Sequence, residues 1–528
     1  MRIRVAGLLA ALLALAELHA GVRWGAMVAG GADSYGYVSQ AGLWRQRRLT
    51  VQQDVVRPSP WPLAAATWAP LGYRPSPKQR DAIVPLYPPG LPLLMAAFQA
   101  IAGFCGAFLV VPLCGALATW LTYVLGRRLF DAPGIALWGA CLVGTSPVFL
   151  YQLMNAMSDV PATAAWTLAL VLTVARRPLA GGLAMGAAIA IRPNLVPLAV
   201  VLLAWIVLSG SKAGLTAAAT RFAIGLVPSI AGIVWLNGRL YESPLTSGYG
   251  TTADYYSLGY LSTNVRQFGS WMADVETPLV ALAGLYFVAP RLFPPAKIPL
   301  ARPLLGGSIA VVILSYLFYR PFDAWWYLRF LLPMWPVMML LTAAAITTMA
   351  RRWSGRVYPI AIAVAIVLLA SHGVLVAARR SAFDLGRSER RYIDVARFIE
   401  SHTDPDAVIL SVQHSGSLRI YGNRLTLRYD VLDPAWLDRT VEYLHSMGRR
   451  PYFVLDGGEV DAFKQRFGTL NRSGALDWPA LATLGSIVAV YDPIDRQPGR
   501  SPLAIGSTRA PRRGWCDPPS SHGRTSGC

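Results

Sequence analysis

Charged residues are scarce in this sequence. Asp, Glu, Lys and Arg make up only 14% of its 528 residues, whereas hydrophobic residues make up 54%. Soluble globular domains carry about 25% charged residues, so the composition excludes an ordinary soluble protein. Several uncharged runs approach the ~20 residues that a helix needs to cross ~30 Å of hydrocarbon. They predict a polytopic α-helical membrane protein rather than a β-barrel, whose segments would be short and alternating.

Cysteine and histidine are also scarce, with five and six residues. No CxxC motif occurs and the histidines are scattered, so a structural zinc site is not expected. Three cysteines lie in apolar segments, where the usual form is a small buried thiol: Cys105, Cys114 and Cys141. Cys516 and Cys528 lie in the tail.

Acidic residues are outnumbered by basic ones, 28 to 48, which gives a formal net charge of +20. In a soluble protein this excess would suggest nucleic-acid binding. No RNA- or DNA-binding motif accompanies it here, and arginines instead flank the apolar segments, as in loops held on the cytoplasmic side of a membrane. We therefore expect no nucleic-acid partner.

About eleven apolar segments are predicted to span the membrane. They are 5–24, 107–126, 134–151, 159–175, 179–191, 195–209, 219–236, 277–290, 303–319, 330–349 and 357–377. The first also resembles a signal peptide, with Arg2 and Arg4 at its basic start. The many later spans favour a retained helix, and both alternatives deliver the chain from Gly30 onward to the outer side.

Basic clusters between these segments predict the orientation. By the positive-inside rule they lie in the cytoplasm with the N-terminus. The apolar segment 91–103 would reverse this order if it crossed, but thirteen helical residues cover only ~20 Å. We interpret it as an interfacial or re-entrant helix on the outer side. The short pair 179–191 and 195–209 also suits a re-entrant hairpin, which leaves the orientation unchanged.

The predicted domains follow from this topology. Residues 1–380 form the transmembrane domain, and 25–106 form its first extracytoplasmic loop. Alternating helix and strand patterns over 381–495 predict a small extracytoplasmic α/β domain without a Gly-rich phosphate loop. The tail 496–528, rich in Pro, Gly, Ser and Arg, is predicted to be disordered.

Two carboxylates and two arginines are predicted to meet at the outer surface. Asp33 follows the first span, and Asp159 begins a later one. Arg192 in "IRPN" and Arg329 in "WWYLRFLLP" lie at neighbouring span ends. Each has a simpler explanation: a surface acid, a helix cap or arginines that reach lipid headgroups. Ionisable groups at membrane depth are costly, so together they form a candidate functional site.

Five short motifs, in this order and on these sides of the membrane, resemble the GT-C glycosyltransferases. They are Asp33 after the first span, "YPPG" at 87–90, "TSP" at 145–147, "SDVPA" at 158–162 and "RFLLP" at 329–333. Over residues 5–377 the chain is most similar to bacterial relatives of the protein O-mannosyltransferases and to the lipid A aminoarabinose transferase. The resemblance implies a GT-C fold, a polyprenyl-phosphate sugar donor and inversion at the anomeric carbon.

The resemblance also assigns roles to residues. Asp33 corresponds to the catalytic base and Asp159 to the second acid, while Tyr35 and Tyr87 flank the site as substrate-binding candidates. Ser34 stands where protein mannosyltransferases have a second acid. Tyr87 stands where the aminoarabinose enzymes have a lysine on the phosphate side. Arg192 and Arg329 are our hypothetical substitutes for that lysine, because the arginine fork donates two bonds to phosphate.

We therefore expect an inverting membrane glycosyltransferase that transfers a sugar to a glycan, lipid or protein acceptor. The composition is typical of a high-GC bacterium, which predicts the cytoplasmic (inner) membrane. No cofactor is expected to be required, and two carboxylates are too few ligands to predict a divalent metal. Alternatives are a transporter or flippase, which should show inverted repeats and mid-span charges, a non-catalytic scaffold, and an O-antigen polymerase or ligase. The loop 238–276 is either a lid over the sugar or an ordinary surface loop, with Asp254 as a weaker candidate carboxylate.

Overall fold

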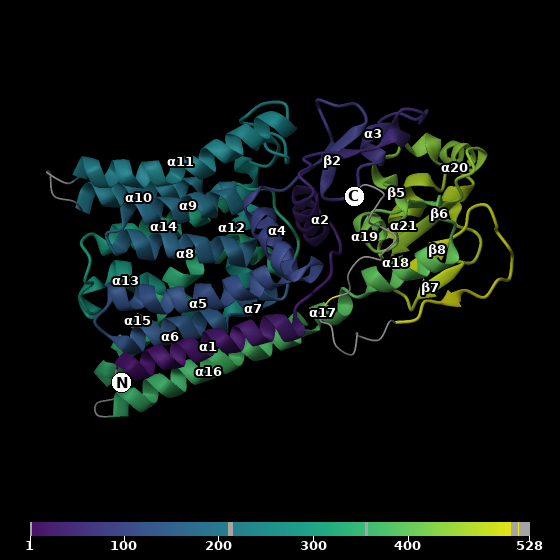
Figure 1. Cartoon of the computed structure of the whole chain (residues 1–528). Helices are drawn as coiled ribbons and strands as arrows, with labels where there is room; N and C mark the ends of the chain where they lie inside the picture. Colours follow the sequence, from purple (N-terminus) through teal and green to yellow (C-terminus); the bar gives the residue numbers. More distant parts are fainter. Residues whose placement is uncertain (1–2, 210–214, 354–356, 508–515, 517–528) are drawn as a thin grey trace.

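The computed structural model describes residues 3–209, 215–353, 357–507 and Cys516. A bundle of helices occupies one end of the molecule and an α/β region formed by the C-terminal part of the chain occupies the other (Figure 1). The first loop, with α2, α3 and β2, lies at the junction between them.

The helical bundle contains membrane-length helices. Among the described residues, five helices are long and apolar enough to cross a membrane, or seven if each of two bent pairs counts as one span. The five are Ile3–Trp24, Phe104–Leu129, Thr216–Leu240, Trp325–Arg352 and Tyr358–Arg379. The bent pairs are Pro133–Gly144 with Pro147–Leu153, and Leu258–Glu276 with Pro278–Val288. The protein is therefore a multi-pass membrane protein.

Helices lie in every predicted segment, but several are too short to cross a bilayer alone. In chain order the bundle contains α1 (Ile3–Trp24), α5 (Val110–Leu129), α6 (Pro133–Gly144), α7 (Pro147–Leu153), α8 (Asp159–Val174), α9 (Pro178–Ile191), α10 (Val196–Ser209), α11 (Leu215–Leu240), α12 (Leu261–Trp271), α13 (Leu285–Val288), α14 (Ala301–Leu317), the 3-10 helix η9 (Trp325–Met334), α15 (Trp335–Trp353) and α16 (Tyr358–Arg379). The total of about eleven spans stays a prediction.

The first loop is ordered between α1 and α5. It contains α2 (Asp33–Arg45), α3 (Ala64–Thr67) and α4 (Gly90–Ala102). Its three short strands, β1 (Val51–Gln52), β2 (Tyr73–Pro75) and β3 (Ala82–Pro85), form an antiparallel sheet with β3 in the centre. The short apolar segment 91–103 is thus a helix, α4, as predicted.

The C-terminal α/β region contains a mixed six-stranded sheet in the order β5-β4-β6-β8-β7-β9. Its strands are β4 (Val408–Leu410), β5 (Leu425–Leu427), β6 (Pro451–Asp456), β7 (Ala482–Leu484), β8 (Val488–Tyr491) and β9 (Leu503–Ala504). Its helices are α17 (Leu385–Ser388), α18 (Arg391–His402), α19 (Ser415–Ile420), α20 (Leu437–Ser446) and α21 (Glu459–Phe467). Strands β4, β5 and β6 are parallel, and β8 is antiparallel to both β6 and β7.

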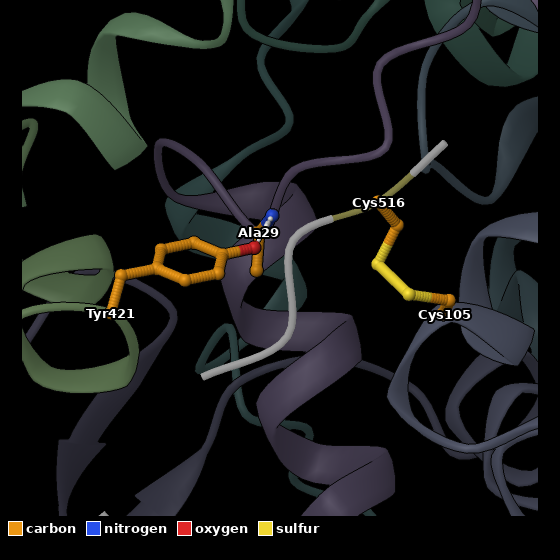
Figure 2. The surroundings of a disulfide bond; sticks show 4 residues. All are labelled: Ala29, Cys105, Tyr421 and Cys516. Carbon is orange, nitrogen blue, oxygen red and sulfur yellow. Dashed lines mark hydrogen bonds between the residues drawn. A yellow bond between two sulfur atoms is a disulfide. The ribbon is translucent and has the colours of Figure 1, made fainter. Parts of the chain in front are cut away.

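Two sequence predictions about the tail need correction. Disorder was predicted from residue 496, but Leu503–Ala504 forms β9 and pairs with β7, an edge pairing too short to leave a pattern in the sequence. Cys105 was predicted to be a buried thiol, but it forms a disulfide with Cys516 (Figure 2). Sequence spacing gave no signal of this bond, because the two cysteines are 411 residues apart. The rest of the tail beyond residue 507 lies outside the described residues.

Candidate active site

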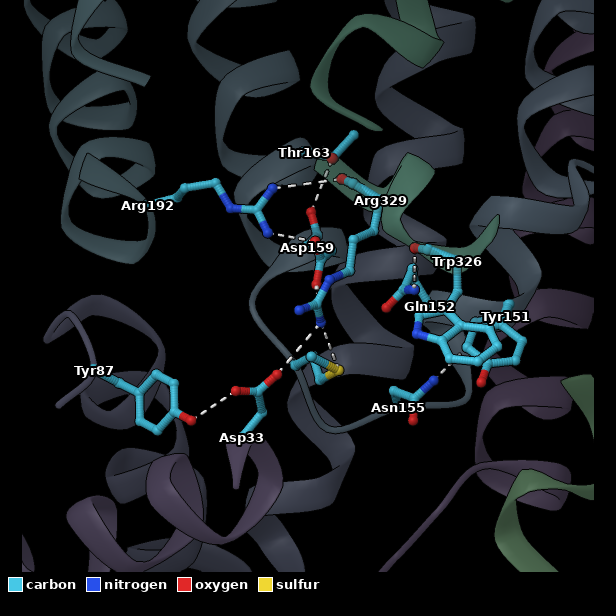
Figure 3. Close-up of polar contacts among 11 residues, drawn as sticks. Asp33, Tyr87, Tyr151, Gln152, Asn155, Asp159, Thr163, Arg192, Trp326 and Arg329 are labelled. Atoms are coloured by element: carbon cyan, nitrogen blue, oxygen red, sulfur yellow. Dashed lines mark hydrogen bonds and ion pairs between the residues drawn. The ribbon is translucent and has the colours of Figure 1, made fainter. Parts of the chain in front are cut away.

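Asp33 is the first residue of α2, directly after the turn at Gly31 and Ala32. A carboxylate in the first turn of a helix is stabilised by the exposed backbone N–H groups. Its Oδ1 accepts a 2.6 Å hydrogen bond from the Tyr87 hydroxyl, and its Oδ2 lies 3.4 Å from an Arg329 guanidinium nitrogen (Figure 3). The Asp33 side chain is 33% exposed, so one carboxylate remains within reach of a substrate.

Tyr87 reaches Asp33 from the diproline turn that precedes α4. Burial of the phenol, together with the negative charge of Asp33, raises the pKa of Tyr87. The hydroxyl therefore stays protonated and donates to the carboxylate. The lysine expected from the resemblance is replaced here by a neutral donor that orients Asp33.

Asp159 is the first residue of α8 and is almost fully buried, with a side chain only 1% exposed. It forms an ion pair with Arg192 through Oδ1 and faces Arg329 at 3.8 Å through Oδ2. Ser158, at the N-cap position, makes no side-chain capping bond. The Asp159 carboxylate is therefore engaged by these two arginines.

The two arginines come from elements that are far apart in the sequence. Arg192 lies directly after α9, where Pro193 begins a short 3-10 turn, and its guanidinium also donates to the Arg329 carbonyl at 3.5 Å. Arg329 lies in η9, and its guanidinium packs over the rings of Tyr327 and Phe330. Because Arg329 contacts both carboxylates, it links them into one cluster (Figure 3). We call Asp33, Asp159, Arg192 and Arg329 the Asp–Arg tetrad.

A cavity of about 460 Å³ opens at the tetrad. All four tetrad residues line it, together with a large set of tyrosines: Tyr37, Tyr249, Tyr255, Tyr256, Tyr316, Tyr319 and Tyr327. Tyrosine combines an apolar ring with a hydroxyl donor and acceptor, which suits a hydroxylated ligand beside an apolar one. Ser247, Gly250 and Thr251 also line the cavity, so part of the predicted loop 238–276 forms one wall.

The sequence predicted only some of the residues that line the tetrad cavity. The loop 238–276 was singled out, but Tyr316 and Tyr319 at the end of α14 were not. In the sequence, these two tyrosines cannot be distinguished from the aromatic residues that line any membrane interface. Asp254 accepts hydrogen bonds from Thr251 within its own turn and does not line the cavity.

Tyr35 is separated from the tetrad. It lies two residues after Asp33 on α2 and therefore points to another side of the helix. Its ring packs against Tyr73, and it lines a second cavity of about 450 Å³ between the first loop and the C-terminal α/β region. Tyr35 does not line the tetrad cavity, so its contact with the substrate stays a prediction.

The tetrad balances two negative against two positive charges. Such a site offers a carboxylate that can accept a proton and a guanidinium pair that can hold an anion. Among the residues that the structure describes, no group of three or more His, Cys, Asp or Glu side chains is arranged to hold a metal ion.

The fold of this chain is similar to the folds of several solved proteins. ArnT from Cupriavidus metallidurans, bound to undecaprenyl phosphate, superposes with a TM-score of 0.59 at 12% identity, over 94% of this chain and 99% of ArnT. The protein has a GT-C-type fold. The Archaeoglobus fulgidus oligosaccharyltransferase tethered to an acceptor peptide gives 0.55 at 13% identity, over 90% of this chain and 72% of that one.

A third GT-C structure extends the similarity. The mycobacterial arabinofuranosyltransferase AftD gives a TM-score of 0.50 at 14% identity, over 87% of this chain and 35% of AftD. No protein-family model and no curated protein sequence matches the chain. The predicted similarity to GT-C proteins is thus confirmed at the level of the fold, over most of the chain.

Proposed function

We propose that this GT-C protein is an inverting glycosyltransferase that moves a sugar from a polyprenyl-phosphate donor to an acceptor hydroxyl or amide. The observation that carries the proposal is the tetrad: one partly exposed carboxylate beside a pair of guanidinium groups that are only 11% and 14% exposed, at the wall of one cavity. The likeness to ArnT, which binds undecaprenyl phosphate, supports the donor class.

In the proposed reaction, Asp33 accepts the proton of the acceptor group as that group attacks the anomeric carbon. The bond between the anomeric carbon and the phosphate oxygen breaks, and the polyprenyl phosphate leaves with the bonding electrons. Arg192 and Arg329 stabilise the charge that develops on the leaving phosphate. No general acid is required, because a phosphate is already a good leaving group. No cofactor enters this scheme.

Asp159 has a different proposed role from Asp33. It is buried and held between two arginines, so it fixes their positions rather than meeting the acceptor. The tyrosines of the cavity wall are placed to contact the sugar, and the exposed apolar face of α4, with Leu93 and Ile101, is placed to meet the lipid. The acceptor is a glycan, a lipid or a protein.

We further propose that the tetrad and the C-terminal α/β region lie on the extracytoplasmic side of a bacterial cytoplasmic membrane, with the N-terminus in the cytoplasm. The positive-inside rule supports this orientation. The disulfide between Cys105 and Cys516 supports it independently, because disulfides persist in oxidising compartments. Reporter fusions near residues 60 and 400 test it, and a cytoplasmic signal at either position would overturn it.

The activity is tested by transfer of labelled sugar from polyprenyl-phosphate donors in membranes that contain the wild type or Asp33→Asn. We expect the wild type to transfer label and Asp33→Asn to transfer none at an equal protein level. Full transfer by Asp33→Asn would exclude Asp33 as the base.

A further inference from the structure

The segment that leads into α2 has little side-chain bulk at its C-terminal end, after Met27 and Val28, which pack in the hydrophobic core. It runs from Gly25 to Ala32, the N-cap of the helix, and contains Gly30 and Gly31 just before that cap. Gly31 has φ of +58°, a conformation that favours glycine. Glycine loses more conformational entropy on folding than other residues, so contacts from neighbouring elements are needed to hold Gly30 and Gly31 in one conformation. We call residues 25–32 the catalytic approach segment, because Asp33 follows it.

The C-terminal α/β region supplies contacts to this segment at several points. The Tyr392 ring, from α18, lies so close to Gly30 that a Cβ built there would be 2.3 Å from its Cδ2. The backbone N–H of Ala29 donates a 2.9 Å hydrogen bond to the Tyr421 hydroxyl (Figure 2). A Cβ at Gly386 would lie 2.8 Å from the carbonyl oxygens of residues 24 and 25. Elements that follow the segment by more than 350 residues thus contact it at three points, in addition to the hydrogen bond that Ala26 donates to Met154 of the helical bundle.

Tyr392 is itself rigidly held. Its hydroxyl accepts a 3.1 Å hydrogen bond from Arg391, and its ring lies 4.7 Å, centroid to centroid, from the ring of His414. Burial lowers the pKa of His414 to about 3, so this ring is a neutral packing partner. Arg391 is paired with Glu389 at 3.1 Å and lies 3.6 Å from Asp456. The Tyr392 ring also faces the approach segment, at Gly30 and Gly31.

The position of these groups in the sheet is informative. His414 follows β4, and Asp456 ends β6, so both lie at the carboxyl edge of two adjacent parallel strands. The chain runs from β4 to β5 on one side of β4 and then crosses to β6 on the other. Open α/β sheets bind ligands at this topological switch point. Here a Cβ at Gly31 would lie 3.4 Å from the Tyr392 hydroxyl and 4.0 Å from Gln413, which also follows β4.

We propose that the C-terminal α/β region uses this switch point to hold the approach segment, and that Tyr392 is the positioning residue for Asp33. The inference rests on the proposed role of Asp33 as the base. The reaction needs the carboxylate within hydrogen-bond reach of the acceptor, and a misplacement of about 1 Å can cost about 100-fold in rate. The region therefore acts on catalysis without touching the substrate.

The proposal is tested by adding a methyl group at Gly30 and removing the ring at Tyr392, separately and together. The variants are Gly30→Ala, Tyr392→Ala and the two combined, with Tyr392→Phe as the conservative variant. Two matched controls are available. Gly42→Ala lies in the same helix as Asp33 with no atom within 4 Å of its new Cβ. Tyr443→Ala removes another tyrosine of the α/β region that reaches the first loop, but at Pro58.

Two measurements are made on the full-length protein in nanodiscs. The first is kcat and KM for a labelled sugar on a polyprenyl-phosphate donor. The second is hydrogen exchange of peptides that cover residues 25–35, which requires no activity. We expect kcat to fall about tenfold or more in Gly30→Ala and in Tyr392→Ala, with the donor KM unchanged, and exchange to rise at 25–35 in Tyr392→Ala.

The combined variant decides the matter. Removal of the ring makes room for the new methyl group, so the combined variant should be faster than Gly30→Ala alone, while Tyr392→Phe and both controls match the wild type. Wild-type kcat and exchange in Tyr392→Ala would overturn the proposal. Faster exchange at 25–35 in Tyr392→Ala, with no transfer by the wild type, would support this positioning role and refute the proposed reaction instead.

Discussion

The two carboxylates of the tetrad are predicted to respond differently to the same substitution. Asp159→Asn removes a charge that is 1% exposed and that pairs with Arg192. Arg192 is itself only 11% exposed and has no other carboxylate partner among the described residues. Asp33→Asn removes a charge that is 33% exposed, 3.4 Å from Arg329. Arg329 then still faces Asp159.

The expected magnitudes follow from burial. Removing one partner of a buried ion pair costs about 3–5 kcal/mol, because the other charge stays buried and unpaired. A pair with a partly exposed partner contributes about 0–1 kcal/mol. Asp159→Asn should therefore lose about 3–5 kcal/mol of stability and Asp33→Asn less than about 1 kcal/mol. Activity should be lost in both, in Asp33→Asn through the base and in Asp159→Asn through the displaced arginines.

The assay combines thermal unfolding of the purified variants in one detergent with transfer of labelled sugar. We expect Asp33→Asn to unfold near the wild-type Tm and Asp159→Asn to unfold several degrees lower. Asp159→Glu, which retains the charge, is the control and should recover part of the lost Tm. Equal Tm values for Asp33→Asn and Asp159→Asn would refute the assignment of Asp159 as the buried charge that organises the tetrad.

Three further predictions follow from single contacts. Tyr87→Phe removes the donor 2.6 Å from the Asp33 carboxylate and should lower kcat about tenfold with an unchanged Tm, and a wild-type kcat would show that the hydroxyl does not orient the base. Burial raises the pKa of Glu459 to about 7, so its contribution to stability should be present at pH 4.5 and lost as pH rises through 7. Glu459→Gln should flatten the dependence of Tm on pH in that window, and an unchanged slope would contradict this. Without reductant, a protease cut between Cys105 and Cys516 should leave fragments joined on a gel until they are reduced, and Cys516→Ser should separate them at once. Separation of the wild-type fragments without reductant would exclude the disulfide.

The tetrad was predictable because its signals are local and independent of tertiary detail. Each member is an ionisable residue at the end of an apolar segment, where the cost of burying a charge makes chance placement rare. The positive-inside rule then placed all of the span ends on one side. The structure brings these four residues to one cavity, although Asp33 and Arg329 are 296 residues apart.

The unpredicted features depend on contacts between distant segments. Tyr316 and Tyr319 look like belt residues until the fold turns them toward the tetrad cavity. The partner of Cys105 and the short edge strand β9 leave no periodic pattern. The contact between Tyr392 and Gly30 was also invisible, since a tyrosine in an amphipathic helix indicates only a buried face.

Because both arginines of the tetrad are already paired with carboxylates, binding of the donor phosphate must affect the base, Asp33. A phosphodiester that enters the cavity competes with both carboxylates for the guanidinium groups, and the two carboxylates compete unequally. Asp159 is buried in direct contact with Arg192, whereas Asp33 is partly exposed and 3.4 Å from Arg329. The phosphate should therefore displace Asp33 from Arg329 first, which frees Oδ2 to accept the acceptor's proton, while Tyr87 continues to hold Oδ1. On this reasoning the base becomes available only when the donor is present, so water alone does not meet a prepared site. Arg329→Lys, which shortens the side chain and loses the planar fork, should weaken donor binding and also uncouple it from the release of Asp33.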